Sequence, residues 1–226
     1  MPQLLEVPRF AQDEGISRVR VWRSRASRRR RGFACLNYLR SRASRRTRGF
    51  IELFMARAPI RPVEIRQLTP ADAEEYVRVR REALVATPFA FIASPEDDRA
   101  SSVEFMRTSL AAPDQATFGA FAPTLVGIVG VGRERYRKAA HKAQVWGTYV
   151  QAEARGLGIG RKLMEQVVTY ARTMPGVTHV HLCVSETAPD AANLYRSLGF
   201  RTWGEDSAGI SIDGVVKAEE YMVLVL

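Results

Sequence analysis

Cysteines and long apolar runs are scarce in this 226-residue sequence, and both shortages exclude classes of protein. The two cysteines, Cys35 and Cys183, cannot form the disulfide framework of a small secreted protein. A low cysteine content is typical of a reducing compartment, so we expect a cytoplasmic protein. No apolar run reaches the roughly 18 residues that a transmembrane helix requires, so we expect no membrane as a partner.

Histidine is also rare, with only His141, His179 and His181 in the whole chain. His179 and His181 fall on one face of an expected strand, but no cysteine or acidic cluster follows at the spacing of a metal site. We therefore predict that the protein holds no metal ion.

Lysine is absent from the first 54 residues, and this segment contains 14 arginines and only four acidic residues. Its net charge of +10 equals that of the whole chain, so residues 55–226 are neutral, with 20 basic and 20 acidic side chains. We therefore expect no nucleic-acid surface on the folded part of the protein.

The arginine-rich segment contains a direct repeat, because residues 24–33 return almost unchanged as residues 41–50. Few large apolar residues accompany the repeat, so we predict a disordered leader over residues 1–60 and a folded domain over residues 61–226. Three hypotheses stay open for the leader. It is a transit peptide, an electrostatic arm for nucleic acid or anionic lipid, or an extension upstream of a true start at Met55.

Strand-like and helix-like patterns follow one another through residues 61–226, which predicts one α/β domain with a mixed sheet. The expected strands are residues 63–68, 117–121, 125–132, 145–150, 178–184, 200–205 and 220–226. Helices are expected after a cap at Thr69, at residues 102–110, at residues 158–173 and after a cap at Thr187.

The turn between the expected strand at residues 145–150 and the helix that follows it contains three glycines on alternate positions, Gly156, Gly158 and Gly160. Glycines leave the backbone amides bare and adopt positive φ without strain. The N-terminus of the helix adds unpaired N–H groups, and Arg155 adds charge. We interpret the turn as an anion site whose natural guest is a pyrophosphate. The alternative is a tight turn with solvated basic residues.

Two other phosphate-binding motifs do not fit this turn. A dinucleotide-binding turn requires Gly-x-Gly-x-x-Gly, whereas the spacing here is Gly-x-Gly-x-Gly. A Walker motif requires Gly-Lys-Ser or Gly-Lys-Thr after the glycines, and this sequence lacks it.

Two segments of the sequence resemble the GNAT N-acetyltransferase superfamily. Arg155, Gly158 and Gly160 match its Arg/Gln-x-x-Gly-x-Gly/Ala motif, and residues 191–200 match its Ala-x-x-Leu-Tyr-x-x-x-Gly-Phe pattern. The resemblance spans roughly residues 65–226. It implies the GNAT fold, which is a mixed, mostly antiparallel central sheet flanked by helices, and acetyl-CoA as co-substrate.

The resemblance also implies roles for particular residues. Tyr195 matches the tyrosine that places its hydroxyl by the coenzyme sulfur and acts as general acid. Ala188 replaces the family's usual asparagine before the second motif, so the chain departs from the family at that contact. The residues implied in coenzyme binding lie in the strand end, the glycine turn and the second motif: Tyr149, Val150, Arg155, Gly156, Gly158, Ile159, Gly160, Arg161, Lys162 and Asn193.

No motif indicates the general base or the acceptor. Glu186, His141 and Glu134 are candidates for the base, and so is a chain of water molecules. The acidic residues 96–98 either favour a cationic amine or form the solvated flank of a helix. We expect acetyl transfer by direct attack of a primary amine of a small molecule or peptide, and we leave a homodimer open.

Two other classes of function remain open. A non-catalytic acyl-CoA-binding module would keep the glycine turn but lack a working acceptor pocket. A nucleic-acid-associated protein would bind through the arginine-rich leader, with an affinity that falls steeply with salt.

Overall fold

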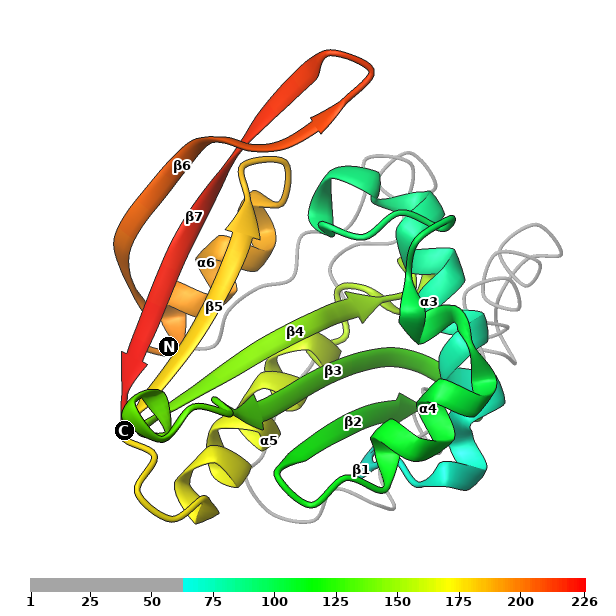
Figure 1. The fold of residues 1–226 in the computed structure, drawn as a ribbon. Coiled ribbons are helices and arrows are strands. Elements are labelled where there is room, and N and C mark those ends of the chain that lie inside the picture. Colours follow the sequence, from blue (N-terminus) through cyan, green and yellow to red (C-terminus); the bar gives the residue numbers. More distant parts are fainter. Residues whose placement is uncertain (1–62) are drawn as a thin grey trace, which may run out of the picture. The chain divides into compact units, whose positions relative to one another are not determined.

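The computed structural model describes residues 63–226, which form a seven-stranded sheet with helices on both faces (Figure 1). The leader predicted over residues 1–60 and the proposed start at Met55 lie outside the described residues. The strands are β1 (Glu64–Gln67), β2 (Gln115–Phe121), β3 (Leu125–Arg133), β4 (Lys142–Val150), β5 (His179–Ser185), β6 (Arg201–Ile212) and β7 (Val215–Val225). The helices are α3 (Ala73–Ala86), α4 (Val103–Leu110), α5 (Ile159–Thr173) and α6 (Pro189–Ser197).

The strand order is β1-β2-β3-β4-β5-β7-β6. Every neighbouring pair is antiparallel except β4 and β5, which run parallel. This parallel pair follows from the chain order, because α5 carries the chain back across the sheet between the two strands. The predicted mixed, mostly antiparallel sheet is confirmed.

The predicted cap at Thr69 begins a 3₁₀ turn that leads into α3, whose own N-cap residue is Asp72. The backbone N–H of Thr69 donates to the carboxylate of Asp72 at 2.8 Å, and a 3₁₀ turn over Pro70–Asp72 leads into the helix. Arg66 donates two further hydrogen bonds to Asp72, and these hold the pKa of that carboxyl well below its usual range. The start of α3 is therefore fixed by a capping box and by an ion pair to β1.

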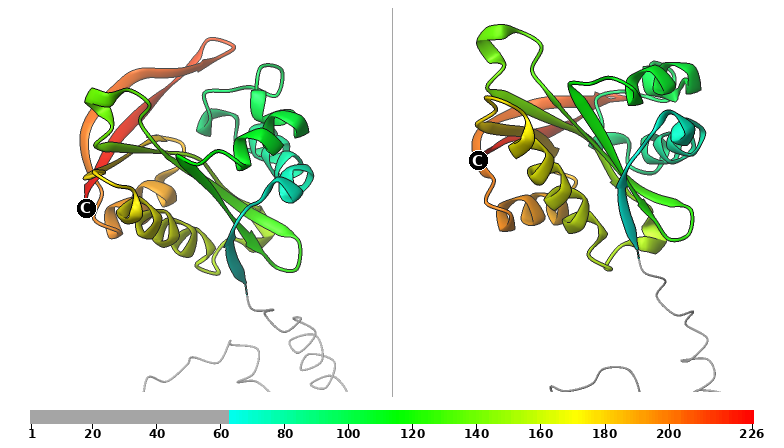
Figure 2. Two further views of the ribbon diagram at one scale, coloured as in Figure 1. Left: turned by 60° about the horizontal axis from the view of Figure 1, so that its bottom comes forward. Right: turned by 90° about the horizontal axis from the view of Figure 1, so that it is seen from below.

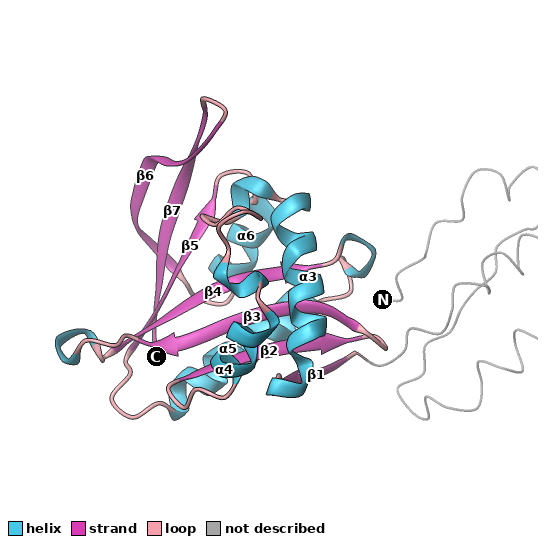
Figure 3. Ribbon diagram, turned by 45° about the vertical axis from the view of Figure 1, so that its right-hand side comes forward, coloured by secondary structure: helices cyan, strands magenta, loops and turns pink. Residues whose placement is uncertain are grey.

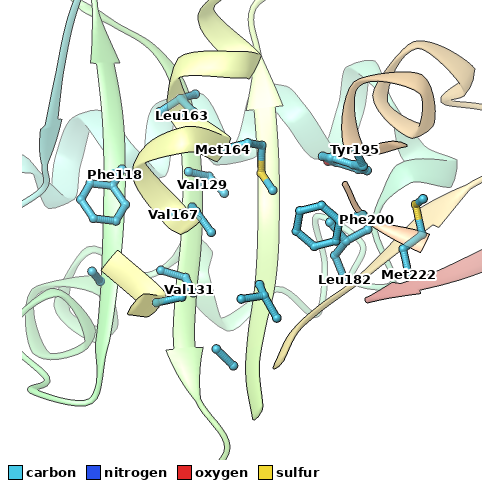
Figure 4. Packing of buried hydrophobic residues seen from close by; sticks show 14 of the residues in the cluster. Phe118, Val129, Val131, Leu163, Met164, Val167, Leu182, Tyr195, Phe200 and Met222 are labelled. Carbon is cyan, nitrogen blue, oxygen red and sulfur yellow. The ribbon is translucent and has the colours of Figure 1, made fainter. Parts of the chain in front are cut away.

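Helices lie on both faces of the sheet (Figure 2), and each face carries a separate core. On one face, Leu163, Met164 and Val167 of α5 pack over Val129 and Val131 of β3 (Figure 4). All five side chains are fully buried, and each contributes roughly 2 kcal/mol of hydrophobic stabilisation.

Helices α3 and α4 cover the other face over β2, β3 and β4 (Figure 3). The buried side of α3 includes Tyr76, Val79 and Ala83, which pack with Ile128 of β3 and Tyr149 of β4. Because α3 and α4 lie on one face and α5 on the other, β4 is sandwiched between two layers of helices. No helix of residues 63–226 is long and apolar enough to cross a membrane.

The β6–β7 hairpin is longer than the sequence patterns predicted. We expected strands at residues 200–205 and 220–226, whereas β6 and β7 extend to a turn at Asp213 and Gly214. Both turn residues have positive φ, 49° and 78°, which is the geometry of a two-residue hairpin turn. The Asp-Gly pair was a signal for this hairpin, but the polar and glycine residues around it hid the strand pattern.

Two local predictions were wrong. Thr187 does not cap α6, because the N-cap residue is Ala188 and the Thr187 hydroxyl lies 3.0 Å from that of Ser185. We expected Cys183 to be buried within the strand at residues 178–184. Cys183 is exposed, because Leu182 and Val184 face the α5 core and the alternation of a strand turns Cys183 to the other side.

Candidate functional site

Strands β4 and β5 separate towards their carboxyl ends (Figure 1). Their parallel ladder covers only three positions, the last of which pairs Gln144 with His181. Beyond this point, the edge of β4 that faces β5 has no strand partner within the described residues. The strands therefore diverge, and a stretch of the β4 edge is left for another group to pair with.

A β-bulge interrupts β4 at the separation. Gly130 of β3 pairs with Trp146 and Ile128 pairs with Tyr149, so two residues of β4, Gly147 and Thr148, lie opposite one residue of β3. Gly147 has a φ of 65°, a conformation that glycine adopts without strain. Sequence reasoning missed this bulge, and Gly147 was its only signal.

One edge donor of β4 follows from the hydrogen-bond alternation after the bulge. The N–H of Gln151 donates to the carbonyl of Val126 on β3 at 2.9 Å. Residues of an antiparallel strand alternate in direction, so the N–H of Val150 points towards the side of β5. The carbonyl of Val150 accepts a hydrogen bond from Arg155 Nε at 2.9 Å, which ties the glycine turn back to β4.

The glycine turn lies between β4 and the N-terminus of α5. Gly156 and Gly158 have φ values of 75° and 74°, and a Cβ added at either residue would meet no atom within 4 Å. The turn therefore presents bare backbone to open space. Gly158 is the N-cap of α5, whose first N–H groups have no partner inside the helix. A bare backbone surface at a helix N-terminus can bind an anion.

The side chains of the turn have different roles in the fold. Ile159 is 2% exposed, so it anchors the turn to the core and offers only its backbone. Gly160 approaches Leu194 of α6, since a Cβ there would lie 3.3 Å from its Cδ2 atom. Arg161 donates to the hydroxyl of Ser197 at 2.7 Å, whereas Lys162 is exposed.

The side chain of Tyr149 fastens the end of β4 to helix α3. Its hydroxyl donates to Glu82 at 3.0 Å, and the amide of Gln151 donates to the other oxygen of the same carboxylate at 2.5 Å. Burial and the hydrogen bond to Glu82 both raise the pKa of Tyr149. No pattern in the sequence indicated Glu82, because it is one acidic residue among several on α3.

Tyr195 lies on α6 and is buried, with only 5% of its surface exposed. Its ring is 6.1 Å from that of Phe200, and both side chains belong to the core on the α5 face of the sheet (Figure 4). Burial raises the pKa of its hydroxyl, and a hydrogen bond with Thr148 opposes part of that rise. Tyr195 is therefore a protonated phenol at neutral pH and lies next to the bulge of β4.

Asn193 is in the same helix but is exposed, and its side-chain oxygen accepts a hydrogen bond from Arg196 at 3.4 Å. The structure thus brings the glycine turn, the end of β4 and Tyr195 to one end of the parallel strand pair. Asn193 lies on the outer side of α6, apart from the buried Tyr195.

The candidate bases lie at different ends of the sheet. Glu134 and His141 precede β4, and the strand itself spans roughly 25 Å to Val150. Glu186 directly follows β5, at the same end as Val150, and its carboxylate is 3.3 Å from Lys217. Within residues 63–226 no group of three or more His, Cys, Asp or Glu side chains could hold a metal ion.

Two of the three acidic residues between α3 and α4, Asp97 and Asp98, are engaged within the fold. Asp98 forms an ion pair with Arg80 at 3.0 Å, and their side chains are only 6% and 10% exposed. Asp97 accepts a hydrogen bond from the N–H of Ser94 at 2.7 Å. Asp98 is therefore neither a solvated flank nor a free carboxylate for a cationic amine.

A known family matches this chain. Residues 77–200 match the model of the acetyltransferase (GNAT) family, which is more than half of the chain. The chain therefore belongs to the GNAT family and is an acetyltransferase, in a family whose typical co-substrate is acetyl-CoA. The predicted family, fold and enzyme class are confirmed.

Particular relatives differ in how much of the chain they cover. N-alpha-acetyltransferase RimI of Mycobacterium tuberculosis is 32% identical over 148 residues, which cover 65% of this chain and 84% of that protein. Mycothiol acetyltransferase of Acidothermus cellulolyticus is 46% identical over 57 residues, 25% of this chain but only 17% of that protein. The protein yncA of Salmonella typhimurium, solved with its cofactor acetyl-CoA, has a TM-score of 0.64 and 18% identity over 72% of this chain and 93% of that chain.

Proposed function

We propose that this acetyltransferase moves the acetyl group of acetyl-CoA to a primary amine by direct attack at the β4 bulge, with Tyr195 as general acid. One observation carries the proposal. A bare glycine turn at a helix N-terminus, an unpaired strand edge and a buried, protonated tyrosine meet at the same end of β4. Each supplies one requirement of acyl transfer from a thioester.

The turn supplies the binding site for the coenzyme's pyrophosphate. Its donors are the backbone N–H groups from Gly156 to Gly160 and those of the first turn of α5, with charge from Arg155, Arg161 and Lys162. The pantetheine arm then follows the edge of β4, where the N–H of Val150 donates to it in place of a strand partner. Tyr149 holds that edge in place through Glu82, and Asn193 is an outer contact from α6.

The chemistry requires the amine to arrive unprotonated. Its nitrogen attacks the thioester carbonyl carbon, a C–N bond forms, and the C–S bond breaks. Backbone N–H groups at the bulge stabilise the oxyanion of the tetrahedral intermediate. The departing thiolate takes the proton of the Tyr195 hydroxyl, and the excess proton of the amine passes to Glu186 or to water. A proton from water then restores the Tyr195 hydroxyl, so that one amine proton in total is transferred to the thiol.

Among acceptors, a peptide α-amine has the better support. RimI, an N-alpha-acetyltransferase, matches the chain over 148 residues, whereas the match to mycothiol acetyltransferase is confined to 57 residues. A small-molecule amine is the second candidate. A cytoplasmic setting is part of the proposal, because a content of two cysteines is typical of a reducing compartment.

The test is Tyr195→Phe, with Tyr170→Phe as the matched control, since Tyr170 packs edge-on against Phe118 in the α5 core. We expect turnover, followed by the thiol that the coenzyme releases, to fall on the order of 100-fold for Tyr195→Phe and to stay unchanged for the control. Acetyl-CoA at 100 times its dissociation constant should still stabilise both variants by about 2.7 kcal/mol. Normal turnover of Tyr195→Phe would remove the tyrosine from the mechanism.

A further inference from the structure

A pocket of about 290 Å³ lies between helices α3 and α4 and strands β2 and β4. This volume is near the lower limit of small-molecule pockets, so the pocket fits a group the size of a side chain rather than a coenzyme. Its walls include Tyr76, Phe105, Met106, Gln115, Thr117 and Trp146.

Trp146 of β4 forms the sheet side of the pocket because two glycines of β3 make room for its indole ring. A Cβ added at Gly130 would overlap the ring, and one at Gly132 would lie 3.0 Å from it. Trp146 nevertheless remains 39% exposed, so part of the ring is open to a ligand. On the helix side, Phe105 of α4 is 37% exposed and presents a second aromatic ring.

The pocket adjoins the bulge where the acetyl group is proposed to react. Gly147 follows Trp146 directly, and a Cβ built on Gly147 would lie 3.8 Å from a guanidinium nitrogen of Arg80 and 3.9 Å from the hydroxyl of Tyr76. Both side chains line the pocket. A molecule whose amine lies at the bulge therefore has its neighbouring substituent at the mouth of the pocket.

The pocket disfavours a cationic group. Arg80 and Asp98 neutralise each other in their buried ion pair. Arg99 keeps its positive charge and stacks on Phe105, with its guanidinium 4.8 Å from the ring centre. The amide nitrogen of Gln115 is engaged with the carbonyl and the hydroxyl of Ser109, at 2.7 and 2.8 Å. The remaining surface combines aromatic faces with neutral polar groups, which suits a flat ring.

We propose that this pocket selects the acceptor, by holding an uncharged aromatic side group against Trp146 while the adjacent amine lies at the β4 bulge. The inference rests on the acetyl transfer proposed above, because it assigns the amine to the reacting position. Trp146 is then a specificity-determining residue, and Gly130 and Gly132 are the residues that allow its position.

The experiment compares three acceptors with the full chain and acetyl-CoA: the amides of phenylalanine, cyclohexylalanine and alanine. For the unaltered protein we expect kcat/KM to be about tenfold higher for phenylalanine amide than for alanine amide, with cyclohexylalanine amide between them. Trp146→Leu should reduce this ratio of kcat/KM values to near one, because the variant lacks the ring against which the aromatic side group packs. The control is Trp203→Leu on β6, where the ratio should not change.

Two results would overturn the assignment: no preference for the aromatic acceptor in the unaltered protein, or a preference that survives in Trp146→Leu. If Trp146→Leu does not unfold cooperatively, Phe105→Ala replaces it. We then expect the same fall to near one in the ratio of kcat/KM for phenylalanine amide to that for alanine amide. If no amide releases thiol, the proposed transfer has failed, and the pocket is judged by calorimetric binding of N-acetylphenylalanine amide. Binding that Trp146→Leu abolishes supports the pocket, and absence of binding overturns it.

Discussion

The turn that we propose to bind the coenzyme is made of backbone, whereas the pocket that we propose to select the acceptor is made of side chains. At the turn, Gly156 and Gly158 expose bare peptide groups, and no side chain is needed to shape the surface. In the pocket, the shape comes from Trp146 and Phe105, and from the ion pair that Arg80 forms within its wall. A backbone surface can be kept while the side chains around it change, so one coenzyme can be combined with many acceptors.

The ion pair between Arg80 and Asp98 gives the largest expected effect. Asp98→Ala leaves the guanidinium buried without a partner, so we expect a loss of about 3–5 kcal/mol in the free energy of unfolding, measured by urea denaturation. Asp97→Ala, at the neighbouring position, should cost less than about 1 kcal/mol. The double change Arg80→Met with Asp98→Leu should recover most of the loss, and failure to do so would mean that the loop, not the ion pair, was destabilised.

Substitution of Gly158 tests the backbone surface of the glycine turn without changing the pocket. Gly158→Ala requires alanine at a φ of 74° and places a methyl group on the anion surface, so we expect acetyl-CoA affinity to fall roughly tenfold or more. Gly176→Ala is the control, because Gly176 has a φ of 76° and equal open space but lies in the turn after α5. Calorimetric titration measures both. Equal losses of affinity in the two variants would contradict a role of the turn in binding.

Substitution of Asp72 gives the smallest expected effect on the free energy of unfolding. It should leave both the glycine turn and the pocket unchanged. Because the hydrogen bond from Arg66 lowers the pKa of Asp72, its stabilisation is fully present above the ordinary aspartate pKa of about 4 and is lost as pH falls through the lower folded-state value. We expect Asp72→Asn to cost about 1 kcal/mol at pH 7, since Arg66 is 37% exposed, and almost nothing near pH 1. Denaturation at both pH values checks this, and a cost that persists at low pH would assign it to the helix cap alone.

The sequence predicted most of the fold where local chemistry decides the structure. Thr69 with Pro70 and Asp72 marked the start of α3, and the apolar period of α5 marked its buried face. The backbone side of the site was equally readable, because positive φ at the turn demands glycine and the glycines stand at fixed spacing.

The acceptor side could not be predicted, because its members are dispersed over the chain and meet only in the fold. Nothing in the sequence connects Arg80 with Asp98, or Trp146 with the glycines of β3, 14 to 16 residues earlier. The hydrogen bond between Tyr149 and Glu82 spans 67 positions. Such contacts depend on how α3 packs on the sheet. This packing cannot be predicted from local patterns in a single sequence.

The short ladder between β4 and β5 also has a mechanical consequence. Three paired positions join the half-sheet β1 to β4 to the half-sheet of β5, β7 and β6, so these few rungs and the helices beneath them resist opening of the sheet. A pantetheine arm hydrogen-bonded along β4 would act as an additional rung. The bound coenzyme would then form part of the sheet. Each turnover would add and remove hydrogen bonds that join the two half-sheets.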